Sequence, residues 1–215
     1  DAMGMNMATI ATQEAADHIE TETPAELVAL SGNLCSDKKP AAVNAVNGRG
    51  RTVSADVTLS RETVADVLKT TPDAIAEANT RKNLVGSAKA GSLGFNAHAA
   101  NTIAAAFLAT GQDIAQVVEG SNAITTVDVR DGGDTLYASL SIASLEVGTV
   151  GGGTKLPTQA ESLDVVGVRG GGDPAGSNAD ALAEVITTAA LGGELSLLGA
   201  LASSHLASAH EELGR

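Results

Sequence analysis

Two adjacent lysines, Lys38 and Lys39, are the residues of this chain best suited to chemistry. Neighbouring ammonium groups repel each other, so in an acidic chain they favour an anionic ligand. Asp37 can neutralise one of them, and Ser31 and Asn33 add hydrogen-bonding groups upstream. A fixed cation aimed at developing negative charge is a powerful catalytic device. A solvated surface loop would contain the same paired lysines, so the segment alone leaves both interpretations open.

Asp113 and the histidines are the other titratable candidates. Asp113 follows Gly111 at a break between helices, where it fits either a helix cap or a carboxylate that keeps a lysine charged. His205 and His210 lie in the C-terminal segment, and imidazole titrates close to neutral pH, as proton transfer requires. His98 is expected to pack or to hydrogen-bond. No spacing of His, Cys, Asp and Glu resembles a metal site, and no metal is expected.

Two glycine-rich segments are candidates for binding a cofactor. Residues 1–7 contain Gly4 among three methionines, and residues 148–154 read Gly-Thr-Val-Gly-Gly-Gly-Thr. Glycine lets the backbone approach phosphate groups or a flat ring closely, which suits a dinucleotide. The Rossmann fingerprint requires a strand, GxGxxG and a helix in succession, and this unit is not present. An ordinary glycine turn is the alternative.

The elements that must position these residues follow from hydrophobic periodicity and capping signals. Strands are expected over 26–31 and 52–59, and in a hairpin formed by 124–129 and 136–142. Helices are expected over 3–20, 60–69, 71–83, 96–109, 178–190 and 194–212, with Ser60, Thr71 and Ser177 as cap residues. The fold class is therefore α+β, with helices dominant and strands mostly antiparallel.

The charge and composition exclude several classes of protein. Lys and Arg number 13 against 26 Asp and Glu, a formal net charge of −13. Such a charge disfavours binding to nucleic acid and to anionic membranes. It indicates adaptation to high salt, as in a haloarchaeal source, with an ordinary acidic protein as the alternative. With two Phe, one Tyr and no Trp, the core is expected to consist of Ala, Val, Leu and Ile, with close helix packing and further burial between subunits.

Cysteine content and hydropathy bear on the compartment. A single cysteine, Cys35, excludes an intrachain disulfide and fits a reducing compartment, so a cytoplasmic protein is expected. The longest apolar run, 103–109, is far shorter than the ~20 residues that a membrane-spanning helix needs. No membrane segment is therefore expected in this chain.

Taken together and in order, these segments closely resemble the C-terminal half of 3-hydroxy-3-methylglutaryl-CoA (HMG-CoA) reductase. The resemblance is carried by Asp-Ala-Met-Gly-Met-Asn-Met at 1–7, Cys-Ser-Asp-Lys-Lys-Pro at 35–40, Ala-Thr-Gly-Gln-Asp at 109–113, residues 148–154 and the histidine-bearing segment 194–210. It implies two hydride transfers from NADPH that reduce HMG-CoA to mevalonate, an isoprenoid precursor, and release CoA. It also implies self-association, as a dimer or larger, with active sites shared between subunits.

The resemblance implies specific roles for individual residues. Lys38 matches the lysine that stabilises the thioester oxyanion, Asp113 matches its aspartate partner, and His210 matches the histidine that protonates the departing CoA thiolate. The implied substrate-binding residues are Ser31, Asn33, Asp37, Lys39, Lys82, Asn101, Leu197 and Leu201. The implied cofactor-binding residues are Asp1, Met3, Gly4, Met5, Asn6, Val150, Gly151 and Gly152. Without the resemblance, the two leucines would be ordinary core residues of an amphipathic helix.

The same resemblance predicts a domain division and a missing part. Residues 1–31 match the C-terminal part of a small, inserted, ferredoxin-like nucleotide-binding domain, and residues 32–215 match the C-terminal part of the large substrate domain. The family's catalytic glutamate and CoA-binding surface would lie upstream of Asp1, so the fragment alone is expected to be inactive. The alternatives are a non-catalytic assembly unit that keeps the dimer surface, and a reductase of another thioester or aldehyde on the same scaffold.

Overall fold

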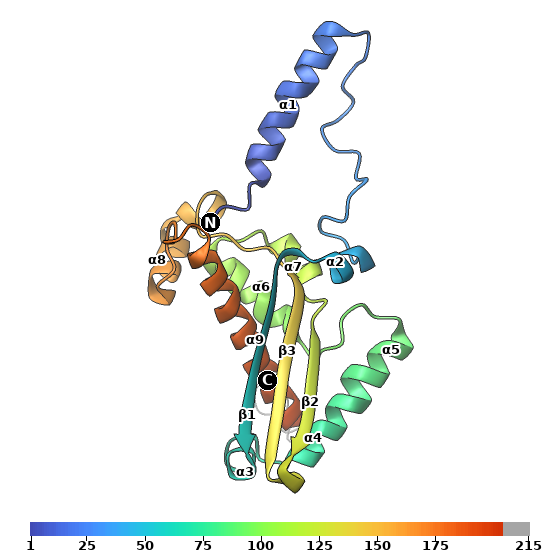
Figure 1. Ribbon diagram of the computed structural model, residues 1–215, viewed down its shortest axis with the longest axis vertical. Coiled ribbons are helices and arrows are strands. Elements are labelled where there is room, and N and C mark those ends of the chain that lie inside the picture. Colours follow the sequence, from blue (N-terminus) through green and yellow to red (C-terminus); the bar gives the residue numbers. More distant parts are fainter. Residues whose placement is uncertain (204–215) are drawn as a thin grey trace, which may run out of the picture.

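The computed structural model describes residues 1–203 and combines a helix-covered sheet with a projecting arm (Figure 1). The sheet consists of β1 (Arg49–Ser60), β3 (Thr135–Leu145) and β2 (Ile124–Arg130), in that spatial order and antiparallel throughout. The helices are α1 (Met5–Glu22), α2 (Ala42–Asn47), α3 (Arg61–Leu68), α4 (Pro72–Ala78), α5 (Ser87–Ala90), α6 (Ala99–Thr110), α7 (Val117–Gly120), α8 (Pro157–Val166) and α9 (Ser177–Ala202). The predicted α+β fold class, with antiparallel strands, is confirmed.

The sheet follows the predicted alternation of side chains. Along β1 every second residue from Val53 onward faces the helices, and the residues between them face solvent. On the solvent side the Arg130 guanidinium lies 3.7 Å from the centre of the Tyr137 ring. The predicted strand 52–59 and the hairpin are confirmed. The predicted strand 26–31 is wrong, because no strand within residues 1–203 lies beside it to accept its hydrogen bonds.

Helix starts and the core also follow local signals. The Ser60 side chain accepts the Thr63 N–H at the start of α3, and the Thr71 side chain accepts the Ala74 N–H at the start of α4, as predicted. The latter helix extends beyond its predicted end through a π-helical segment, 79–86, into α5. The buried core consists of aliphatic residues and alanines around Phe107, in agreement with the composition.

Two predictions about helix α9 are wrong. It runs without interruption through Gly192 and Gly193, where two separate helices were expected, and it begins after Gly176, with Ser177 as its first residue and not its cap. A Cβ added to Gly193 would lie 3.0 Å from the Thr102 side chain and 3.3 Å from that of His98, so this glycine allows close packing against α6. The helix is also long and apolar enough to cross a membrane, contrary to the expected limit on apolar runs, but its buried side packs on β1, β3 and α6 as a core helix does.

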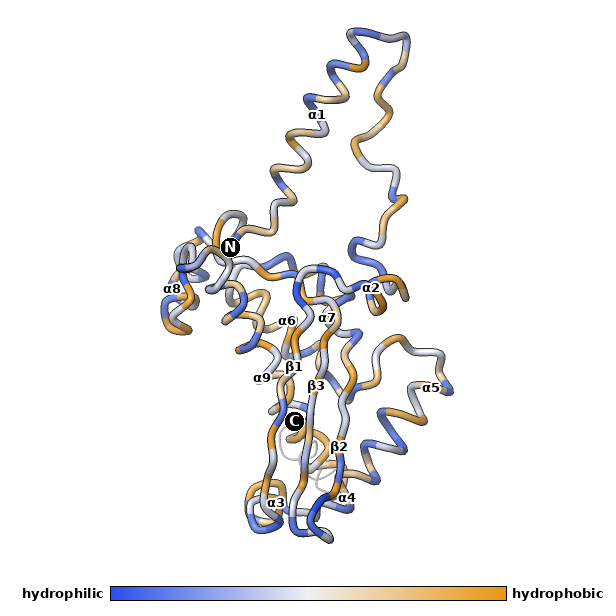
Figure 2. The backbone as a smooth tube through the Cα atoms, in the orientation of Figure 1, coloured by the Kyte–Doolittle hydropathy of each residue, from blue (hydrophilic) through white to orange (hydrophobic). Residues whose placement is uncertain are grey.

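The arm comprises α1 and the segment 23–41 that returns to the sheet (Figure 1). None of the residues of α1 is buried, so the apolar face predicted for this helix has no partner within residues 1–203. Apolar residues recur along both limbs of the arm (Figure 2). Those most exposed are Met7, Ile10, Ile19, Val28 and Leu34. The arm therefore presents apolar surface that the described chain does not cover.

Candidate active site

An ion pair between Lys38 and Asp113 joins the returning limb of the arm to the segment after α6. The Lys38 Nζ lies 2.8 Å from the Asp113 Oδ2, and both side chains are partly exposed. The hydrogen bond to Asp113 raises the pKa of Lys38 above its ordinary value, which further favours the ammonium form that a lysine has at neutral pH. Asp113 also accepts the Ala115 N–H at 3.1 Å, so it is a helix cap and a lysine partner at once. Both readings of this aspartate therefore apply.

The side chains of Lys39 and Ser31 form hydrogen bonds within their own loop. The Lys39 Nζ donates to the Asp37 carbonyl oxygen at 2.9 Å and contacts the Cys35 Sγ at 3.3 Å. The hydrogen bond from Lys39 lowers the pKa of the Cys35 thiol. Asn33 donates its N–H to the Ser31 hydroxyl at 3.3 Å, and both residues are exposed. Of the two lysines, Lys38 is therefore the one that reaches another element.

Asp37 belongs to a charged cluster that sequence reasoning missed. The Arg49 Nη1 lies 2.7 Å from Asp37 Oδ1 and 3.2 Å from one oxygen of each of two glutamates, Glu119 and Glu146. Burial opposes ionisation of Asp37, but the hydrogen bond from Gln116 and the charge of Arg49 outweigh it, and the pKa of Asp37 is lowered. Buried charges cannot be recognised from residue type. The one available signal was an arginine between two glycines at the start of a strand.

Glu146 is the member of this cluster whose protonation is expected to change near neutral pH. Burial, followed by the negative charge of Glu119, raises the pKa of Glu146 from 4.5 to about 7. Between these values the folded chain binds a proton at Glu146 that the unfolded chain releases. The contribution of this group to stability is therefore greatest below pH 4.5 and is lost as the pH rises to about 7.

We expect Glu146→Gln to remove this pH dependence. At about pH 8 the variant should be more stable than the unmodified chain, by up to about 3 kcal/mol, and at about pH 5 the difference should shrink. Urea unfolding of both proteins at the two pH values measures the effect. A variant that is destabilised equally at both would show that Glu146 is ionised in the folded protein throughout.

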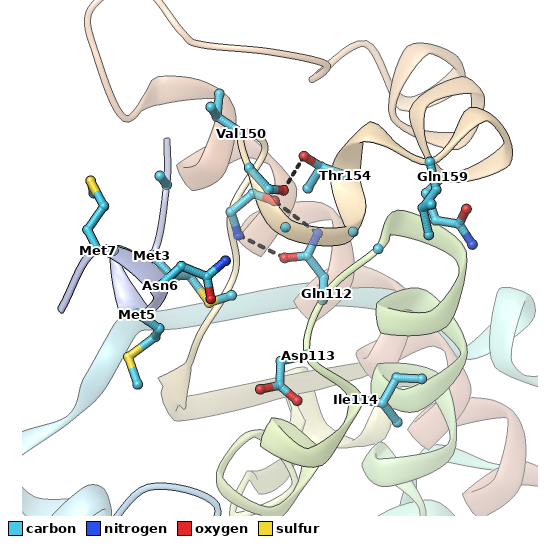
Figure 3. A pocket seen from close by; sticks show the side chains of 18 of the residues that line it. Met3, Met5, Asn6, Met7, Gln112, Asp113, Ile114, Val150, Thr154 and Gln159 are labelled. Carbon is cyan, nitrogen blue, oxygen red and sulfur yellow. Dashed lines mark hydrogen bonds between the residues drawn. The ribbon is translucent and has the colours of Figure 1, made fainter. Parts of the chain in front are cut away.

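Seven of the eight residues predicted to hold a cofactor line one cavity of about 580 Å³ (Figure 3). It is lined by residues 2–7, by Gly148 and residues 150–154 of the glycine-rich segment, and by residues 111–114, which include Asp113. The cavity volume lies within the range of small-molecule sites. The lining residues that were predicted from the sequence are Met3, Gly4, Met5, Asn6, Val150, Gly151 and Gly152.

Gln112 and two glycines fix the relative position of the cavity walls. The Gln112 side chain donates to the Gly148 carbonyl oxygen at 2.9 Å and accepts the N–H of the same residue at 2.8 Å (Figure 3). Beside it, Gly111 lies directly against Gly153, and a Cβ added to Gly111 would come within 2.4 Å of the Gly153 carbonyl oxygen. Gly111 also has φ +73°, a conformation that side chains disfavour.

Gly111→Ala is therefore expected to destabilise the chain more than Gly132→Ala does. Gly132 has a similar φ of +68° but open space around its Cβ position, so it shares the backbone strain without the contact. We expect an additional loss of about 1–3 kcal/mol for Gly111→Ala, the usual cost of overpacking. Urea unfolding of the two variants measures the difference. Equal losses would mean that the two segments separate at no cost.

Asp1, the eighth residue predicted to bind the cofactor, forms hydrogen bonds with two other segments of the chain. Its carboxylate accepts the N–H groups of Gly172 and Gly176 at 3.0 and 3.1 Å, just before α9. Its carbonyl oxygen accepts the Thr149 N–H at 2.8 Å. Asp1 does not line the cavity. Its contacts instead tie the beginning of the chain to the glycine-rich segment.

Four further predicted substrate-binding residues are not bonded to Lys38 in the described part of the chain. Within residues 1–203, no hydrogen bond or ion pair joins Lys38 to Lys82 or to Asn101, both of which are exposed. Leu197 and Leu201 are half-buried on α9, whose core contacts come from other residues. His210 lies outside the described residues. The same described range contains no group of three or more His, Cys, Asp and Glu side chains that could hold a metal ion.

A charged lysine and its aspartate beside a glycine-lined cavity can stabilise negative charge that develops on a bound ligand. The family profile described as hydroxymethylglutaryl-coenzyme A reductase matches residues 1–215, and the chain belongs to this family. It is 74% identical to the 3-hydroxy-3-methylglutaryl-coenzyme A reductases of Halobacterium salinarum and Haloferax volcanii. It is 60% identical to that of Pyrococcus abyssi. In all three the match covers 100% of this chain and 53% of the relative, so the chain spans about half the length of the curated relatives it matches.

Proposed function

We propose that this chain supplies the catalytic lysine and one wall of the cofactor site of an enzyme that reduces HMG-CoA to mevalonate and CoA. The single observation that carries the proposal is the Lys38–Asp113 pair, 2.8 Å apart, beside a cavity that Asp113 helps to line. A positive charge held in this way would stabilise the negative charge that develops on a carbonyl oxygen during its reduction. The names of the 74% identical relatives supply the substrate.

The proposed chemistry balances as two reductions. Hydride addition to the thioester carbonyl carbon gives a hemithioacetal oxyanion, which the Lys38 ammonium stabilises while Asp113 keeps that lysine charged. The carbon–sulfur bond then breaks, and the CoA thiolate takes a proton from His210. A second hydride adds to the carbonyl carbon of the resulting aldehyde, and the alkoxide that forms takes a proton from water to give the alcohol of mevalonate. NADPH, when bound, supplies one hydride in each reduction.

The residues that line the cavity are of chemical types that suit the proposed cofactor. Methionines 3 and 5 offer apolar surface for a flat nicotinamide ring, and the backbone of Gly151 and Gly152 is open to close approach. Asn6 adds an amide that can bind a carboxamide or a phosphate. We therefore assign residues 2–7 and 148–154 to the cofactor, with Asp1 as a residue that positions the second segment.

We propose that other parts of the protein complete the site. Lys82, Asn101, Leu197 and Leu201 are proposed to bind substrate in a site shared with a second copy, because within residues 1–203 none of them is bonded to Lys38. Helix α1 has an apolar face that the described residues do not cover. We infer that residues 1–31 belong to a small nucleotide-binding domain and that the rest of that domain covers α1. The rest of that domain and the catalytic glutamate would come from sequence that the relatives have outside the matched half.

A chimera tests the proposal. The matched segment of the Halobacterium salinarum reductase is replaced by these 215 residues, and HMG-CoA-dependent NADPH oxidation is measured in molar KCl, the condition that the net charge of −13 favours. We expect turnover. A folded chimera of the same oligomeric state as the unmodified relative that is inactive with HMG-CoA would refute the reductase assignment.

The exposed arm favours one alternative, a non-catalytic assembly unit. Its uncovered apolar residues would then serve association alone. In that case the chimera would assemble but would not bind NADPH. Turnover of another CoA thioester or aldehyde in place of HMG-CoA would instead indicate a related reductase.

A further inference from the structure

Glu119 is a buried carboxylate with no place in the chemistry above. It lies on α7 with a fully buried side chain, an arrangement that is rare for an acidic residue without a structural or functional partner. One of its carboxylate oxygens, Oε1, accepts the backbone N–H of Lys38. The same oxygen lies 3.2 Å from the Arg49 Nη1. Glu119 therefore touches the proposed catalytic lysine from inside the protein.

The backbone of Lys38 needs such a partner. Lys38 has φ +56°, a left-handed conformation that lysine adopts rarely because of its Cβ. A residue in this region persists when its surroundings hold it there. The charge-assisted hydrogen bond from the Lys38 N–H to Glu119 is one such constraint, and the turn closed by the Lys39 N–H on the Ser36 carbonyl oxygen at 3.3 Å is another.

Arg49 extends the same constraint to Asp37. Its Nη1 lies between Glu119 and Asp37, at 3.2 and 2.7 Å, so one guanidinium connects the buried glutamate to the residue that precedes Lys38. Glu146 also contacts this nitrogen at 3.2 Å. Because burial keeps Glu146 protonated to about pH 7, it competes weakly for the charge of Arg49.

We propose that Glu119 is a positioning residue for the reduction: its buried carboxylate fixes the Lys38 backbone directly, and Asp37 through Arg49, so that the Lys38 ammonium points at Asp113. This inference rests on the proposed function for the role of Lys38, but the geometry that it describes can be tested without turnover. Its prediction is specific to one oxygen, the acceptor of the Lys38 N–H.

Two substitutions in the chimera separate the acceptor from the charge. Glu119→Gln keeps a side-chain oxygen that can accept the Lys38 N–H, whereas Glu119→Leu fills the space without an acceptor. Hydrogen exchange resolved to single residues reports on the Lys38 amide, which should exchange slowly in the unmodified chimera and in Glu119→Gln. In Glu119→Leu we expect exchange that is roughly 10- to 100-fold faster, from the loss of a hydrogen bond to a charged group.

Glu194→Gln is the matched control. Glu194 is equally buried and accepts the backbone N–H groups of Ala97 and His98, but it has no contact with the Lys38 segment. This variant should leave exchange at the Lys38 amide unchanged. Fast exchange at Lys38 in the unmodified chimera, or equal exchange in Glu119→Leu, would overturn the inference whether or not the chimera reduces HMG-CoA.

Kinetics then tests the consequence for catalysis. We expect kcat to fall by about 10²-fold in Glu119→Leu, the usual cost of misplacing a catalytic group by about 1 Å, with the KM for NADPH unchanged and with most activity retained in Glu119→Gln. Loss of exchange protection with kcat unaffected would also overturn the positioning role. A chimera without turnover but with the expected exchange pattern would contradict the proposed function alone.

Discussion

Replacement of Lys38 by alanine is expected to reduce the turnover of the chimera by about 10²- to 10³-fold, the usual effect of removing one group that stabilises an oxyanion. The ammonium group is held 2.8 Å from Asp113, which keeps it charged at neutral pH. Its interaction with the substrate oxygen strengthens as negative charge develops, so kcat should fall more than the affinity for NADPH. NADPH oxidation with saturating HMG-CoA measures the change.

Lys89→Ala is the control for charge. Lys89 is an exposed lysine on α5 and belongs neither to the cavity beside Asp113 nor to the ion pairs of the described residues. Its removal alters the net charge by the same amount as Lys38→Ala does. If the two variants lost activity equally, the effect would be one of overall charge, and the role assigned to Lys38 would be wrong.

The largest effect on stability is expected from Glu194→Ala. The Glu194 carboxylate is fully buried and accepts three hydrogen bonds, from the Ala97 N–H at 2.6 Å, the His98 N–H at 2.7 Å and the Thr125 hydroxyl at 2.7 Å. Removing it leaves one buried and two partly buried donors without this acceptor, and each unpaired buried donor costs about 1–3 kcal/mol. We therefore expect a loss of about 3 kcal/mol or more in the free energy of unfolding, measured with urea in high KCl.

Glu184→Ala is its matched control on the same helix. Glu184 is exposed on α9, so its replacement should change stability by no more than about 0.5 kcal/mol. A similar loss in the two variants would mean that Glu194 is not the residue that joins α9 to the start of α6 and to β2.

Local patterns in the sequence predicted the elements whose partners are within residues 1–203. Strand β1 and the β2–β3 hairpin alternate apolar and polar residues because one face packs on helices. The segment 26–31 has similar residues but no neighbouring strand within the described range, so its pattern gives no strand. Gly192 and Gly193 suggested a helix end, yet packing against α6 keeps the helix continuous.

For the candidate site too, some residues could be predicted from the sequence and others could not. Lys38, Asp113 and the glycine-rich segments could be identified from the resemblance to a family, since their motifs are local in sequence. Arg49 and Glu119 could not, because their importance depends on burial and on contacts across 70 residues of chain. Residue type alone predicts a solvent-exposed side chain at both positions.

The placement of Tyr137 has a practical consequence for spectroscopy. The chain has no tryptophan and a single tyrosine, which lies under the Arg130 guanidinium on the solvent side of β3. Tyr137 pairs with Thr58, toward the end of the sheet opposite to the Arg49–Ser144 pair. The fluorescence of Tyr137 therefore reports on opening of the hairpin and does not report on ligand binding near Lys38. A tryptophan introduced at exposed Leu156, which lines the cavity, would emit against an almost dark background.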